Sequence, residues 1–138
     1  MPWELISLQF KRDERGFLVP LELGRNLPFE LKAAFYIGGT KAQTVRGQHA
    51  HLKLKELIIA LRGEVIVKLE DLWGTKEVPL THPLEGLLVH PLTWLEIQIL
   101  SEDCILLVLM DHPYDEKEVL RDYRTFKDLL KIDLKKWP

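Results

Sequence analysis

The stretch that decides the fold reads RGQHAHLKLKE over residues 46–56. On an extended strand, successive side chains point to opposite faces, so the rings of His49 and His51 lie on the same side of the sheet. Glu56 follows five residues after His51, and Gly63 lies seven residues beyond Glu56. Two imidazoles and a carboxylate at this spacing, followed by a turn glycine, predict a polar site on one face of a β-sheet.

The segments around this stretch have the composition of short strands. Residues 57–61 and 64–69 are rich in Ile, Val and Leu, and Arg62-Gly63 between them predicts a hairpin. Residues 94–100 alternate, with Leu95, Ile97 and Ile99 on one face. Further strands are expected at residues 17–21, 31–37, 76–80, 86–89 and 104–110. About eight to ten strands at short spacing are typical of a β-sandwich or barrel.

The C-terminal part of the chain has a different period. From Asp115 to Leu130 the apolar residues recur at spacings of three and four, which predicts an amphipathic helix. Asp115 is the expected N-cap, with acidic residues in the first turn. With 138 residues and no repeat or low-complexity stretch, residues 1–138 are expected to form a single domain.

Composition and charge exclude several classes of protein. The formal net charge is −2, which argues against a nucleic-acid-binding protein. One cysteine, Cys104, forms no internal disulfide and no zinc site built from cysteine pairs. The longest apolar run, residues 104–110, is too short for a membrane span, which needs about 20 residues. The first residues, MPWE, do not resemble a secretory signal, so a cytoplasmic location is expected.

The spacing in residues 46–63 resembles the first motif of the cupins. That motif is His-x-His, four residues, Glu, six residues and Gly, and His49, His51, Glu56 and Gly63 match it. Cupins are double-sheet jelly rolls. The resemblance therefore implies an all-β, double-stranded jelly roll with a short C-terminal helix, in agreement with the strand count.

A narrower resemblance extends along nearly the whole chain. The run Arg46-Gly-Gln-His-Ala-His51 is similar to the Arg-Gly-x-His-Ala-His signature of the nucleotide-sugar 3,4-ketoisomerases, a family of small cupins. Ordered matches elsewhere in the chain support it. They are Asp13-Glu14-Arg15-Gly16, Asn26-Leu27-Pro28-Phe29, Phe35-Tyr36-Ile37, Gly86-Leu87, Pro91, Trp94, Asp111, Tyr114-Asp115-Glu116, Arg121, Tyr123 and Phe126.

The resemblance implies an isomerase with no obligatory cofactor. It implies that the keto group of a thymidine-diphosphate-linked 4-keto-6-deoxyhexose moves from carbon 4 to carbon 3 through an enediolate, in deoxysugar biosynthesis for a lipopolysaccharide or S-layer glycan. Histidine suits the proton transfers, because its ordinary pKa is near neutrality. The implied catalytic residues are His49, His51 and Tyr36. The implied substrate-binding residues are Arg46, Trp94 and Arg121. The family also implies a homodimer.

One departure from the family keeps two alternatives open. Leu95 stands where the family usually has a histidine after the tryptophan, so the fourth ligand of a typical metal cupin is missing. The first alternative is a metal-dependent cupin enzyme that uses His49, His51 and Glu56 as a facial triad. The second is a cupin that binds a nucleotide sugar without turning it over. The sequence does not divide the acid and base roles between the two histidines.

Overall fold

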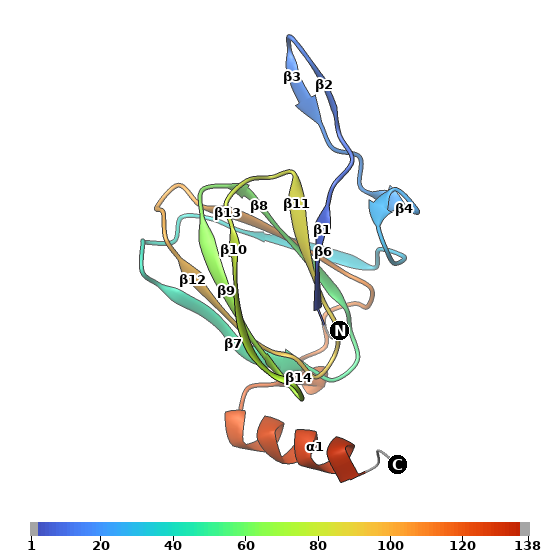
Figure 1. The fold of residues 1–138 in the computed structure, drawn as a ribbon, viewed down its shortest axis with the longest axis vertical. Coiled ribbons are helices and arrows are strands. Elements are labelled where there is room, and N and C mark those ends of the chain that lie inside the picture. Colours follow the sequence, from blue (N-terminus) through green and yellow to red (C-terminus); the bar gives the residue numbers. More distant parts are fainter. Residues whose placement is uncertain (1–2, 136–138) are drawn as a thin grey trace.

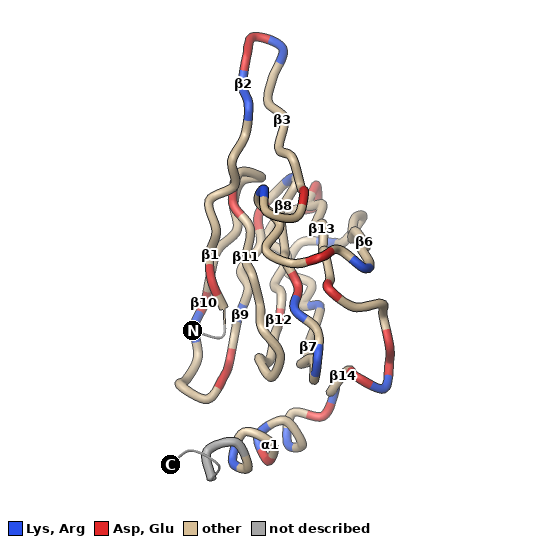
Figure 2. The backbone as a smooth tube through the Cα atoms, turned by 90° about the vertical axis from the view of Figure 1, so that its right-hand side faces the viewer, with Lys and Arg blue, Asp and Glu red and all other residues tan. Residues whose placement is uncertain are grey.

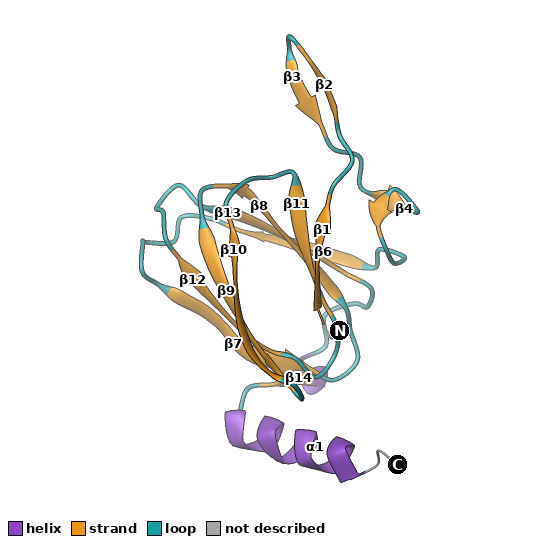
Figure 3. Ribbon diagram, viewed as in Figure 1, coloured by secondary structure: helices purple, strands orange, loops and turns teal. Residues whose placement is uncertain are grey.

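Two antiparallel sheets of five strands each face one another in the computed structural model, which describes residues 3–135 (Figure 1). One sheet contains, in spatial order, β1 (Trp3–Ser7), β11 (Glu85–Val89), β8 (Glu56–Arg62), β13 (Ile105–Met110) and β6 (Ala33–Ile37). The other contains β10 (Gly74–Leu80), β9 (Val65–Asp71), β12 (Trp94–Ile99), β7 (Val45–His51) and β14 (Val119–Leu120). Strands dominate, with one helix at the C-terminal end (Figure 3), which confirms the predicted fold class.

The main core lies between the two sheets. On β12 the alternation predicted from the sequence is confirmed, because Leu95, Ile97 and Ile99 are all buried in this core. By contrast, β8 is buried on both faces. Ile58 and Ala60 face the main core. Leu57 and Ile59, which alternate with them, pack under the N-terminal segment around Leu8 and Phe29. A strand covered on both sides has no polar face, which is why residues 57–60 form a continuous apolar run.

The predicted hairpin at Arg62-Gly63 is wrong, although both of its strands exist. Strands β8 and β9 belong to different sheets, so the chain crosses between the sheets at Gly63 instead of pairing back on itself. The backbone of Gly63 has φ +76°, and a Cβ atom there would lie 2.3 Å from Ser101 Oγ and 2.8 Å from Cys104 Cα. Glycine is required by both the conformation and the close packing.

The predicted helix over residues 115–130 starts later than expected. Asp115 caps a short 3-10 turn, η1 (Glu116–Glu118), where its side chain accepts a hydrogen bond from the N–H of Lys117. The next residues form β14, which pairs with the end of β7. The helix proper, α1 (Tyr123–Lys135), begins after Asp122, whose carboxylate accepts hydrogen bonds from the N–H of Arg124 and the hydroxyl of Thr125. An edge strand therefore replaces the first turns of the expected helix.

Two small two-stranded units lie outside the main sheets. Strands β2 (Lys11–Asp13) and β3 (Gly16–Leu18) form a hairpin that projects beyond the two main sheets (Figure 1). Strand β4 (Glu22–Leu23) lies beside β5 (Asn26–Leu27). Positive and negative residues are interspersed along the described part of the chain (Figure 2). Within the described residues, no helix is long and apolar enough to cross a membrane.

Candidate active site

A cavity of about 500 Å³ lies between the two sheets and contains the histidine pair. Its wall is largely apolar, and its polar groups come from β7, the start of β8 and the segment that follows Met110. The apolar lining consists of Phe35, Ile37, Val45, Ile58, Leu95, Ile97, Val108, Met110 and Val119. A largely apolar wall with a few convergent polar groups is the usual form of a small-molecule site.

A bulge in β7 sets the positions of the polar residues that this strand contributes. His49 pairs with Leu95 of β12, but the next pairing along the strand is Gly47 with Glu96, which leaves Gln48 as an extra residue. Both Gly47 and Gln48 have positive φ. Because an extra residue shifts the alternation, Arg46 and His49 line the same cavity although they are three residues apart.

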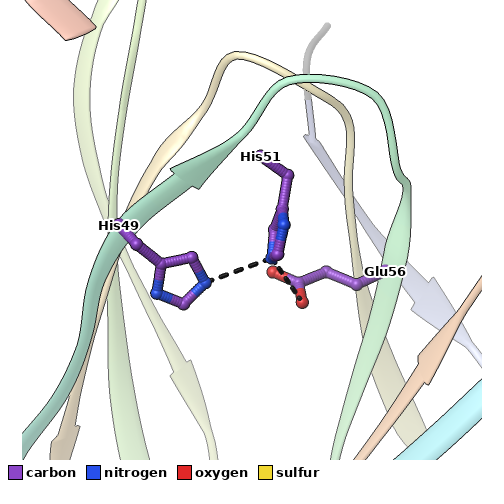
Figure 4. Close-up of side chains that lie close together, drawn as sticks. All are labelled: His49, His51 and Glu56. Carbon is purple, nitrogen blue, oxygen red and sulfur yellow. Dashed lines mark hydrogen bonds and ion pairs between the residues drawn. The ribbon is translucent and has the colours of Figure 1, made fainter. Parts of the chain in front are cut away.

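The two histidines contact each other directly. The Nε2 atoms of His49 and His51 are 3.1 Å apart, and the rings meet edge to face. Glu56, at the start of β8, places Oε2 3.6 Å from His51 Nε2 (Figure 4). The other carboxylate oxygen of Glu56 is buried without a hydrogen-bond partner among the described residues. A buried acceptor left free in this way is available to a hydroxyl group of a ligand.

Burial and charge push the pKa values of the two imidazoles apart. Burial lowers the pKa of His49, because loss of water disfavours the imidazolium. Burial acts in the same direction on His51, but the neighbouring carboxylates of Glu56 and Glu118 outweigh it and raise the pKa of His51. A neutral imidazole beside a protonated one gives the site a base and an acid at the same pH.

Two arginines line the same cavity at exposed positions. Arg121, which follows β14, is held by the carboxylate of Glu116 and by the hydroxyl of Tyr114. The hydrogen bonds from Arg121 and Tyr114 lower the pKa of Glu116 to about 2. Arg46 also lines the cavity and forms no ion pair with any residue that the structure describes. Guanidinium groups match the geometry of phosphate oxygens, so these side chains suit an anionic group at the mouth of the cavity.

The structure does not bring Tyr36 or Trp94 into this cavity. On β6 the neighbours of Tyr36, Phe35 and Ile37, line the cavity, whereas Tyr36 points away and is 79% exposed. On β12 Trp94 lies on the face opposite Leu95 and packs under α1, with its ring centroid 5.5 Å from that of Phe126. The roles of Tyr36 in catalysis and of Trp94 in substrate binding stay predictions, since neither side chain lines this cavity in the single chain.

The residues predicted as an alternative metal site do lie together. One donor atom from each of His49, His51 and Glu56 can be chosen so that all three lie within 4.8 Å of one another. Leu95 lines the cavity in place of a fourth ligand. The donor set fits a three-residue facial site, and the same arrangement suits direct proton transfer between the rings.

Glu118 is a site residue that the sequence reasoning missed. Its carboxylate is 2.9 Å from Nδ1 of His51, and both side chains are buried. In the sequence Glu118 reads as one of several acids at the start of a helix. The contact joins residues 67 positions apart and has no local signal in the sequence.

Comparison with known proteins gives a consistent result. The family described as "WxcM-like, C-terminal" (FdtA) matches residues 1–131. The TDP-4-oxo-6-deoxy-alpha-D-glucose-3,4-oxoisomerase of Aneurinibacillus thermoaerophilus is 40% identical over 132 residues, covering 94% of this chain and 95% of that protein.

Solved structures of similar proteins have the same fold. The sugar 3,4-ketoisomerase QdtA from Thermoanaerobacterium thermosaccharolyticum, crystallised with TDP, superposes with a TM-score of 0.91 at 34% identity over 96% of each chain. The TDP-fucose-3,4-ketoisomerase WlaRA from Campylobacter jejuni superposes with a TM-score of 0.88 at 32% identity, over 94% of this chain and 96% of that one.

Proposed function

Because the chain belongs to the FdtA family of cupin-fold sugar 3,4-ketoisomerases, we propose that it converts a TDP-linked 4-keto-6-deoxyhexose into the 3-keto isomer. The observation that carries this proposal is the pair of imidazoles whose Nε2 atoms lie 3.1 Å apart in a largely apolar cavity. The isomerisation removes a proton from carbon 3 and delivers one to carbon 4, and two neighbouring imidazoles can divide these two transfers. The opposite pKa shifts of the two rings suit those two roles.

We assign the base role to His49 and the acid role to His51. Neutral His49 takes the proton from carbon 3, and the electrons of that C–H bond form a C3=C4 double bond while the carbon 4 carbonyl becomes an oxyanion. A proton then passes from the oxygen on carbon 3 to the oxygen on carbon 4. Protonation of carbon 4 by His51, with formation of the carbon 3 carbonyl, completes the reaction with no net change in atoms or electrons.

The short contact between the rings lets the two histidines return to their starting protonation states after each turnover. At the end of the reaction His49 carries the extra proton and His51 has lost one. Because their Nε2 atoms are within hydrogen-bond distance, the proton returns along that contact. The buried, unpartnered oxygen of Glu56 is positioned to accept a hydroxyl group of the sugar.

Arg46 and Arg121 are proposed to hold the diphosphate. Both line the cavity from exposed positions, where the nucleotide part of the substrate reaches solvent. When the substrate binds, Arg121 replaces part of its hydrogen bonding to Glu116 with a phosphate oxygen. Arg46 has no ion pair with a carboxylate among the described residues, so it binds phosphate without breaking one. Tyr36 and Trp94 are left out of the proposed site.

A homodimer and a cytoplasmic location are also proposed. Apolar side chains of the N-terminal part are exposed in the single chain, including Phe17 and Leu18 on the β2–β3 hairpin. A second copy is the partner that the family resemblance implies. Sedimentation of the purified protein at two concentrations tests the dimer directly.

Two rival functions are tested by the same preparation. A metal-dependent cupin enzyme would use His49, His51 and Glu56 as ligands, and the 4.8 Å clustering of their donor atoms is the observation in its favour. It predicts that chelation abolishes turnover and that one divalent ion restores it. A cupin that binds without turnover predicts a saturable TDP titration and no isomerisation.

The decisive assay follows a TDP-linked 4-keto-6-deoxyhexose by proton magnetic resonance. We expect conversion to the 3-keto isomer by the wild type, and a loss of about 100-fold or more in His49→Asn and His51→Asn. His82→Asn is the matched control, because His82 is a half-exposed histidine that does not line the cavity. Equal rates in all four proteins would contradict the assignment of the histidine pair.

A further inference from the structure

We propose that Glu118 is a positioning residue that holds His51 in one tautomer, with a proton on Nδ1, so that Nε2 is the atom that exchanges protons in the cavity. The inference rests on the proposed isomerase function and adds a residue to it. Glu118 lies outside the motif of residues 46–56, in the turn η1.

Every polar atom of the Glu118 side chain has a donor. Oε2 lies 2.9 Å from Nδ1 of His51. Oε1 accepts hydrogen bonds from the backbone N–H of Lys53 at 3.0 Å and of Leu54 at 3.2 Å. Glu118 is 6% exposed and His51 is 8% exposed, so water does not compete strongly for these contacts. A buried carboxylate that receives three hydrogen bonds is held in one orientation.

The backbone around Glu118 fixes it to the strand that carries the histidine. The N–H of Leu52 donates to the carbonyl of Glu118 at 2.9 Å, and Val119 pairs with His51 in the β14–β7 ladder. The carboxylate and the ring that it contacts are therefore held by the same pairing. A shift of the C-terminal segment would move the imidazole as well.

The chemistry of the contact determines the tautomer. A carboxylate only accepts hydrogen bonds, so Nδ1 of His51 must be the donor. Nε2 then faces His49 Nε2 at 3.1 Å and Glu56 Oε2 at 3.6 Å, and it gains or loses the one mobile proton of the ring. A carboxylate on the far nitrogen of a catalytic histidine orients that histidine in this way in serine hydrolases.

The test compares Glu118→Gln with a control variant that also removes a carboxylate contact between the C-terminal segment and the main sheets. In the Gln variant the amide oxygen still accepts from Lys53 and Leu54, but the amide NH2 faces Nδ1 of His51 and pairs only with an unprotonated nitrogen. The control is Glu70→Gln. Glu70 also ties the C-terminal segment to the barrel, through Tyr123 and Lys127, and does not line the histidine cavity.

Two readouts separate positioning from a purely structural role. The first is the ring nitrogen spectrum of neutral His51 in protein labelled with nitrogen-15. We expect protonated Nδ1 in the wild type and in Glu70→Gln, and protonated Nε2 in Glu118→Gln. The second is turnover. We expect kcat of Glu118→Gln to fall by about 100-fold or more, by analogy with loss of the orienting carboxylate in a catalytic triad. We expect its KM to stay close to the wild-type value.

Each outcome bears on the proposal. Unprotonated Nδ1 in neutral His51 of the wild type would overturn it even if Glu118→Gln failed to fold. Wild-type kcat in Glu118→Gln, or an equal loss in both variants, would overturn it as well. Absence of isomerisation by the wild type would instead overturn the proposed function, and the nitrogen spectrum would still decide whether Glu118 sets the tautomer.

Discussion

Replacing Glu56 by Gln should move the pH range in which the enzyme works. In the proposed mechanism His49 must be neutral and His51 protonated, so the rate falls as pH drops through the lowered pKa of His49 and as pH rises through the raised pKa of His51. Glu56 raises both pKa values. Removing its charge should therefore shift both limbs of the pH–rate curve to lower pH.

The size of the shift on the alkaline limb follows from the distance between the charges. Two unit charges 3.6 Å apart interact by about 4–5 kcal/mol at an effective dielectric constant of about 20. One pKa unit corresponds to about 1.4 kcal/mol, so the upper bound is about 3 units. Glu118 stays in place, and the Gln amide oxygen retains part of the favourable field at His51. We therefore expect the alkaline limb to move down by about 1–3 units.

The assay is kcat/KM for the 4-keto substrate measured between pH 5 and pH 10, for the wild type and Glu56→Gln. Thermal melting at each pH confirms that both proteins are folded. Glu77→Gln is a suitable control, because Glu77 is an exposed β10 residue that does not line the histidine cavity. An alkaline limb that stays within about 0.3 units of the wild type would refute the role of the Glu56 charge in keeping His51 protonated.

Further predictions concern stability, nucleotide binding and metal. Phe126→Ala should lower the free energy of unfolding by about 3–5 kcal/mol, because this side chain of α1 is fully buried against Ala50 and Trp94; urea denaturation measures this, and a loss below about 1 kcal/mol would contradict it. Arg46→Ala should weaken TDP binding by about 10-fold to 100-fold, as expected for the loss of one charge-assisted hydrogen bond. An unchanged Kd in a calorimetric titration would exclude the proposed contact of Arg46 with the diphosphate. Activity should survive prolonged chelation, since Leu95 provides no fourth ligand; complete loss, restored by one divalent ion, would favour the metal-dependent enzyme.

The sequence predicts the sheet faces well where the period of two is unbroken. Leu95, Ile97 and Ile99 are buried in the core as predicted. The same alternation places Trp94 on the outer face of β12, so the strand pattern alone could have predicted that Trp94 does not line the cavity. The place of Arg46 was not readable from alternation, because it depends on the bulge at Gly47 and Gln48.

Long-range contacts account for what the sequence could not predict. The run at 57–69 reads as a hairpin because local composition says nothing about which sheet each strand joins. Val119 and Leu120 have helix-compatible spacing, but pairing with the exposed edge of β7 makes them a strand. That pairing also brings Glu118 to His51, which is why the orienting carboxylate has no local signature.

The central claim, proton transfer by His49 and His51, is tested most directly by isomerisation in heavy water. Removal of the carbon 3 proton by one histidine and protonation of carbon 4 by the other, with ring protons that exchange with the solvent, predict deuterium at carbon 4 of the 3-keto product. They also predict exchange at carbon 3 of the substrate as the reaction approaches equilibrium. His49→Asn and His51→Asn should slow both processes by about 100-fold or more, whereas His82→Asn should not. Isomerisation and deuterium incorporation at wild-type rates in both cavity variants would contradict the account.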